Sequence, residues 1–160
     1  MRFLTTAAAV IAAATVVTGA ALAGTTSKTL AFKATFSGTA TTQATDNVVS
    51  ISASGAGKGT VIGAAKITGT GTGDSSQQPC VPFAGTGKMT GPGGTLTFKV
   101  IPGSQGCGDE AGQVFSVSGK ATVLKGTAKL RKAKGTLRMT GVYDRSSGAF
   151  SVKFTGTFPA

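Results

Sequence analysis

The sequence predicts an all-β protein, an antiparallel up-and-down β-barrel of about eight strands, with a β-sandwich as the alternative. Apolar residues alternate with Thr, Ser and Lys in one segment after another. This is the pattern of strands with one buried apolar face, which we call the dry face, and one solvent-exposed polar face, which we call the wet face. Glycine-rich turns separate these segments, and no window beyond the first residues carries a helical stripe. Short strands without helical crossovers favour an antiparallel meander.

The individual strands follow from the same alternation. The strongest patterns predict strands at 30–36, 49–53, 96–100, 137–139 and 150–158. Weaker patterns predict strands at 62–68, 86–90, 113–117 and 121–124. The longest stretch without a strand pattern is 71–83, which we interpret as a loop. The Gly57-Lys58-Gly59-Thr60 sequence lacks the Ser or Thr that follows Lys in a phosphate-binding loop, so we interpret it as a hairpin turn.

The first 23 residues have the features of a secretory signal peptide. Arg2 supplies a positive charge, 3–17 is apolar and rich in Ala, and Ala21-Leu22-Ala23 offers small residues for cleavage. An uncleaved membrane anchor is disfavoured because the stretch is only weakly apolar. We therefore predict a signal peptide at 1–23, a single barrel domain at 24–160, and a secreted or extracytoplasmic location.

The two cysteines are predicted to form a disulfide. An exported protein meets an oxidising compartment, and Cys80 and Cys107 are the only Cys residues in the chain. Both lie in loop-like sequence between predicted strands. A bond between them would tie two loops together at one end of the barrel.

Several segments resemble a group of small secreted bacterial β-barrel proteins. The resemblance rests on Gly57 to Gly63, on 126–137 and on the ending 148–158. The barrel of this group is similar to that of allene oxide cyclase, which implies the same fold over nearly all of the mature chain. The shared residues are mainly structural glycines, so they imply little about activity. Val61 stands where the group often has His, and no role of that His carries over.

Positive charge dominates the chain, with 16 Lys and Arg against 5 Asp and Glu and a net charge of +11. One block holds many of these cations: Lys120, Lys125, Lys129, Arg131, Lys132, Lys134 and Arg138. We predict an anion-binding strip in its second part, Lys129, Arg131, Lys132, Lys134 and Arg138. An anionic cell-envelope polymer is the expected partner, and a solvated edge that prevents strand pairing is the alternative. Nucleic acid is disfavoured because the block lacks aromatic stacking partners.

Catalysis is not expected from this composition. The chain has no His, so most acid–base triads and imidazole metal sites are excluded. Glu110, beside Asp109 in a predicted loop, is the only candidate for a catalytic carboxylate. No cofactor or metal is expected. The alternatives are an isomerase or cyclase-type barrel enzyme acting on an apolar substrate, and a structural surface protein without a ligand.

Aromatic residues mark the predicted interior. Five of them are predicted to face the lumen: Phe32, Phe98, Phe115, Phe150 and Phe154. They either fill the barrel or line a cavity for a small apolar ligand. A transmembrane barrel is disfavoured because one Tyr and no Trp cannot form the aromatic girdles of such a barrel. We expect a secreted, non-catalytic binding or cell-envelope accessory protein that does not cross the membrane.

Overall fold

A computed structural model of the chain describes residues 28–159. The predicted signal peptide at 1–23 lies outside the described residues. Within them the chain forms nine strands and one 3-10 helix. The strands are β1 (Thr29–Thr45), β2 (Val48–Gly59), β3 (Gly63–Asp74), β4 (Cys80–Gly91), β5 (Gly94–Val100), β6 (Gln105–Gly108), β7 (Val114–Gly126), β8 (Thr136–Asp144) and β9 (Ala149–Pro159), and the helix is η1 (Ala128–Leu130).

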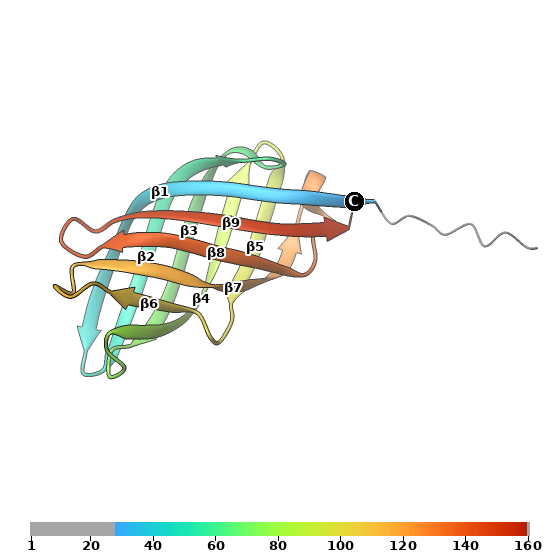
Figure 1. Ribbon diagram of the computed structural model, residues 1–160. Coiled ribbons are helices and arrows are strands. Elements are labelled where there is room, and N and C mark those ends of the chain that lie inside the picture. Colours follow the sequence, from blue (N-terminus) through green and yellow to red (C-terminus); the bar gives the residue numbers. More distant parts are fainter. Residues whose placement is uncertain (1–27, 160) are drawn as a thin grey trace, which may run out of the picture.

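The strands close into an antiparallel barrel (Figure 1). β1 pairs with β2 on one side and with β9 on the other, which joins the first strand to the last. β5 and β6 both pair with β4 and β7, so the two short strands occupy one position in the barrel. The predicted up-and-down barrel of about eight strands is confirmed, and the sandwich alternative is not adopted.

β1 takes part in two pairings that overlap along its length. It pairs with β9 through 29–39 and with β2 through 34–45. In Figure 1 it follows the top of the barrel and then turns steeply downward at the left. Gly38 lies opposite Gly55 in the overlap, and a Cβ on Gly38 would collide with the carbonyl oxygen of Ser54. Glycine is required here because the two backbones approach so closely.

Residues 101–104 interrupt the position that β5 and β6 share. The buried Ser104 hydroxyl accepts a hydrogen bond from the Lys120 backbone N–H at 3.1 Å and donates one to the Ile101 carbonyl at 2.9 Å. Gly119 leaves room for it, because a Cβ on Gly119 would collide with the Ser104 side chain. A side chain thus satisfies backbone groups where the ladder is broken.

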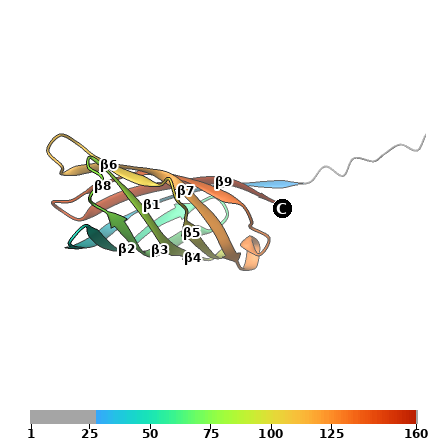
Figure 2. The same cartoon turned by 90° about the horizontal axis from the view of Figure 1, so that it is seen from below.

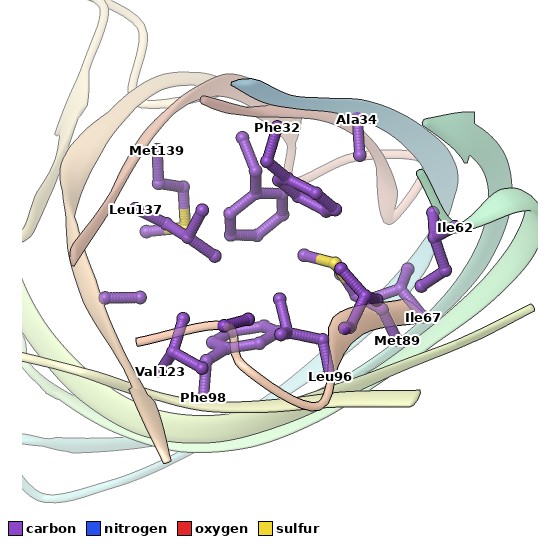
Figure 3. Close-up of a cluster of buried hydrophobic side chains, with 14 of the residues drawn as sticks. Phe32, Ala34, Ile62, Ile67, Met89, Leu96, Phe98, Val123, Leu137 and Met139 are labelled. Atoms are coloured by element: carbon purple, nitrogen blue, oxygen red, sulfur yellow. The ribbon is translucent and has the colours of Figure 1, made fainter. Parts of the chain in front are cut away.

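The strands present apolar side chains to the interior and Thr, Ser and Lys to the outside. In β1, Phe32, Ala34 and Phe36 are buried, whereas their neighbours Lys33 and Thr35 are exposed. Figure 3 shows side chains from several strands, including Phe32, Leu96 and Leu137, converging in the barrel interior. Rings pack directly on each other in this core, with centroids of Phe98 and Phe154 5.2 Å apart. The predicted dry and wet faces are therefore present.

The connection between β7 and β8 covers one end of the barrel, which we call the closed end. It contains η1, and it buries Leu130 and Ala133 against the core. The Lys129 backbone N–H donates to the Gly93 carbonyl at 3.1 Å, which ties η1 to the turn between β4 and β5. η1 lies at the same end as the last residues of β9 (Figure 2). The opposite end, with the β1–β2, β3–β4, β6–β7 and β8–β9 connections, is the mouth.

Some predicted boundaries were wrong. The predicted loop at 71–83 is mostly strand, since β3 continues to Asp74 and β4 begins at Cys80. The predicted strands at 113–117 and 121–124 are one strand, β7. Lys58 and Gly59 still belong to β2, and the hairpin turn follows them. Glycine weakens a local strand pattern, but pairing with a neighbour on both sides of a closed barrel stabilises the strand.

Candidate functional site

The mouth half of the barrel holds an open cavity of about 550 Å³. Five side chains of the buried core also line the cavity and form its floor: Ile67, Phe98, Val100, Met139 and Phe154. Its walls are formed by residues of the strands near the mouth, among them Ala40, Ile51, Val117 and Val152. The volume lies within the range of roughly 300–1,000 Å³ that small-molecule sites occupy.

Small inward-facing residues leave this space unfilled. The inward-facing Ala and Gly residues that line it on β1 to β4 are Ala40, Ala44, Ala53, Gly69, Gly71, Gly85 and Gly87. Gly71 lies opposite Gly85, and a Cβ on either one would collide with a backbone carbonyl oxygen of the other strand. The close approach of β3 and β4 therefore requires glycine, and glycine adds no volume to the lumen. The sequence carried a signal for this cavity in the alternate glycines of 69–73, but our sequence analysis did not use it.

Four of the five Phe residues predicted to face the lumen line the cavity: Phe98, Phe115, Phe150 and Phe154. Phe32 also points inward, but it lies in the packed core with its ring centroid 5.4 Å from that of Phe158, outside the cavity lining. Phe83 lines the cavity as well. The sequence analysis missed Phe83 because it stood at the edge of the predicted loop.

Polar side chains enter the lining near the mouth. The Tyr143 hydroxyl lies 3.4 Å from the Thr42 hydroxyl, and the Tyr143 ring packs 6.3 Å from Phe115 between centroids. Arg145, directly after β8, and Gln78, in the β3–β4 connection, also line the cavity. A ligand with an apolar body and one polar end would therefore find partners for that end at the mouth.

The carboxylates at the mouth shape its loops. Asp144 accepts hydrogen bonds from the Ser146 hydroxyl at 2.6 Å and the Ser146 N–H at 2.8 Å. The hydroxyl bond from Ser146 is the largest cause that lowers the pKa of Asp144 from 3.8 to about 2. Asp74 makes the same pair of bonds with Ser76, and its pKa is lowered for the same reason. Both groups are hydrogen-bonded turn residues at the ends of strands.

Glu110, the candidate catalytic carboxylate, is exposed in the β6–β7 connection and is not part of the cavity lining. Its neighbour Asp109 accepts hydrogen bonds from the N–H groups of Gln113, at 2.8 Å, and Val114, at 3.3 Å. Within 28–159 no three His, Cys, Asp or Glu residues lie close enough to hold a metal. The same part of the chain contains no helix long and apolar enough to cross a membrane.

The predicted disulfide between Cys80 and Cys107 is confirmed. Its setting differs from the prediction, because the two residues face each other on β4 and β6 instead of joining two loops. Their Cα atoms are 3.9 Å apart. The next residue on β4, Val81, and the preceding residue on β6, Gly106, line the cavity. The bond thus fastens the shortest strand to the cavity wall.

The residues predicted to bind anions are all exposed, and they lie in two places. Lys129, Arg131, Lys132 and Lys134 gather at the closed end, in the connection that holds η1. Arg138 lies on the outer face of β8, directly opposite Lys120 of β7. The structure therefore separates the strip from the cavity, which opens at the other end.

Comparisons with known protein families, curated proteins and solved structures found no match for this chain. The resemblance to allene oxide cyclase barrels stays a prediction.

Proposed function

We propose that this chain is an exported, non-catalytic binding protein that holds a small apolar molecule in its cavity. The observation that carries the proposal is the cavity of about 550 Å³ in a barrel whose other half is packed. Apolar walls left in contact with water cost about 25 cal/mol per Å². A ligand that covers those walls would recover this free energy.

The lining determines the kind of ligand. Phe, Val, Ile and Ala side chains make up most of the surface, and the polar groups Tyr143, Arg145 and Gln78 lie toward the mouth. An apolar body would be buried against the floor at Phe98 and Phe154, with its polar end near the loops. Export is part of the proposal, and the disulfide supports it because such bonds persist mainly in oxidising compartments.

Binding without catalysis is favoured by the chemistry of the lining. General acid–base catalysis needs a titratable group within hydrogen-bond reach of the substrate. The sequence has no His, and its five acids lie in the mouth loops or at the strand ends beside them. Among the described residues that line the cavity there is no carboxylate.

The cyclase-type alternative has one observation in its favour. Tyr143 and Thr42 form a polar pair in an otherwise apolar wall, with Arg145 nearby in the lining. Such groups could orient a reactive substrate without a triad. Turnover of an unsaturated fatty epoxide that is lost in Tyr143→Phe or Glu110→Gln would replace the binding proposal with this enzyme.

A cavity-filling variant tests the binding proposal. Gly106 faces the cavity, and the nearest atom to a Cβ there is a Phe115 ring carbon at 3.8 Å, an ordinary contact. Gly106→Leu should therefore place its side chain in the cavity without a backbone collision. Gln105→Leu places the same side chain at the neighbouring position, which is exposed, and is the matched control. The probe is N-phenyl-1-naphthylamine, which is uncharged and so is not attracted by the basic surface.

We expect the unaltered protein to enhance the fluorescence of the probe, and a C14 fatty alcohol to displace it. Gly106→Leu should weaken binding by about tenfold or more, equivalent to about 1.4 kcal/mol, and Gln105→Leu should leave it within about twofold. Ala53→Phe, on β2, is a second cavity-filling variant should Gly106→Leu fail to fold. Failure of the unaltered protein to bind either compound, or binding by both cavity variants as tight as that of the unaltered protein, would overturn the proposal.

A further inference from the structure

Charge is separated along the barrel axis. All five acidic residues lie in the mouth loops or on the strand ends that enter them: Asp46, Asp74, Asp109, Glu110 and Asp144. Among the described residues, Arg145 is the single Lys or Arg in these loops. The other described cations lie on the barrel wall or at the closed end. The two ends of the molecule therefore carry opposite local charge.

Five exposed cations cluster at the closed end in the last residues of β7 and the connection that follows, and we call this cluster the basic end: Lys125, Lys129, Arg131, Lys132 and Lys134. The buried side chains of Leu130 and Ala133 anchor this segment in the barrel. Backbone hydrogen bonds fix it further, from Ala133 N–H to the Leu130 carbonyl at 2.8 Å and from Val123 N–H to the Gly135 carbonyl at 2.9 Å. The same segment thus closes the barrel with its apolar residues and presents its cations outward.

Apolar groups accompany these cations. β7 carries one extra residue opposite the step from Thr97 to Phe98 of β5, and this bulge residue, Leu124, is 57 % exposed beside Lys125. A shallow depression at the same end is lined by Leu30, Ala128, Lys129, Arg131, Lys132 and Pro159. Cations around exposed apolar side chains are typical of surfaces that bind at a lipid interface.

We propose that the closed end docks on a bilayer of anionic phospholipids, with the mouth of the cavity facing away from the membrane. The cations gather in one segment at the end of the barrel, around a small depression, so a plane of mobile headgroups can match them. Leu124 favours a bilayer over a soluble polyanion, because only the bilayer offers it an apolar phase. Three other exposed large apolar residues, Val48, Val114 and Val142, lie toward the mouth, where the acids would be repelled by the same headgroups.

The first test uses vesicle binding. The exported protein, its intact mass recorded, is floated with vesicles of phosphatidylglycerol and phosphatidylcholine, and with phosphatidylcholine alone. Binding should require phosphatidylglycerol and should be lost at high salt, which shortens the Debye length from about 10 Å to about 3 Å. The triple variant Lys129→Gln, Arg131→Gln, Lys134→Gln should bind roughly 100-fold more weakly, because each cation near an anionic bilayer contributes about fivefold in affinity.

The matched control removes three cations from the barrel wall: Lys99→Gln, Lys120→Gln, Lys153→Gln. These residues lie five or six positions from the closed-end termini of their strands, or roughly 17–20 Å along the strand, beyond the Debye length of about 10 Å at 0.1 M salt. The control should lose less than about threefold in affinity. An equal loss of affinity for vesicles in both triple variants would show general charge attraction and overturn the proposal. Binding to soluble polyphosphate without binding to vesicles would overturn it as well.

Orientation is tested with tryptophan, which the sequence lacks. Leu124→Trp places a reporter at the closed end and Val114→Trp places one near the mouth, both at exposed positions. Lipids brominated on their acyl chains should quench the first reporter and leave the second unaffected. Quenching of Val114→Trp alone, or of both equally, would overturn the proposed orientation. The probe-binding assay on the cavity is independent of these outcomes.

Discussion

Asp144 shows how a single carboxylate organises a loop at the mouth. Its hydrogen bonds from Ser146 lower its folded-state pKa to about 2, from an ordinary value of 3.8. A lowered pKa means that its contribution to stability is complete above about pH 4 and is lost as the pH falls through about 2. A carboxyl-detected NMR titration should place its midpoint near pH 2.

The Ser146→Ala variant removes the largest cause of the shift. We expect the pKa of Asp144 to rise toward 3.8 in this variant, because the hydroxyl no longer donates to the carboxylate. Ser54→Ala, at an exposed position on β2, is the control and should leave the midpoint unchanged. An unchanged midpoint in Ser146→Ala would contradict the assigned cause.

At the scale of an element, the segment around η1 closes one end of the barrel. Leu130 is 1 % exposed, whereas Leu124, six residues earlier, is 57 % exposed. Leu130→Ala should lower the free energy of unfolding by about 2–5 kcal/mol, since it removes a packed side chain and leaves a void. Leu124→Ala should change it by less than about 0.5 kcal/mol.

Urea unfolding of the two variants measures this difference. Both changes remove the same atoms, so any contrast reports burial and not residue type. Near-equal values would show that the segment does not close the barrel in solution.

For the whole molecule, export and covalent closure can be measured together. The mass of the exported protein should correspond to processing before Gly24, because Ala21-Leu22-Ala23 precedes it. No thiol should react with an alkylating reagent until the protein is reduced, because Cys80 and Cys107 are bonded. A mass that retains residues 1–23, or two reactive thiols without reduction, would contradict the prediction.

Alternation along the chain predicted the fold class and most of the inward-facing residues, because the period of two is a local property of an extended backbone. It predicted the positions of Phe98 and Phe154 in this way. It did not predict that the five acidic residues gather at the mouth of the barrel. In an up-and-down barrel each strand reverses the chain, so dividing β7 into two strands assigns every later connection to the wrong end.

The sequence by itself determined that the chain forms antiparallel strands with a dry face and a basic wet face, and that its two cysteines pair. Only the tertiary structure decided where space is left inside. Whether a Gly or Ala position is filled depends on side chains that reach it from other strands, and Gly71 and Gly85 meet only through the register of β3 with β4. Closure of β1 on β9 and the anchoring of Leu130 then make one end packed and leave the other open.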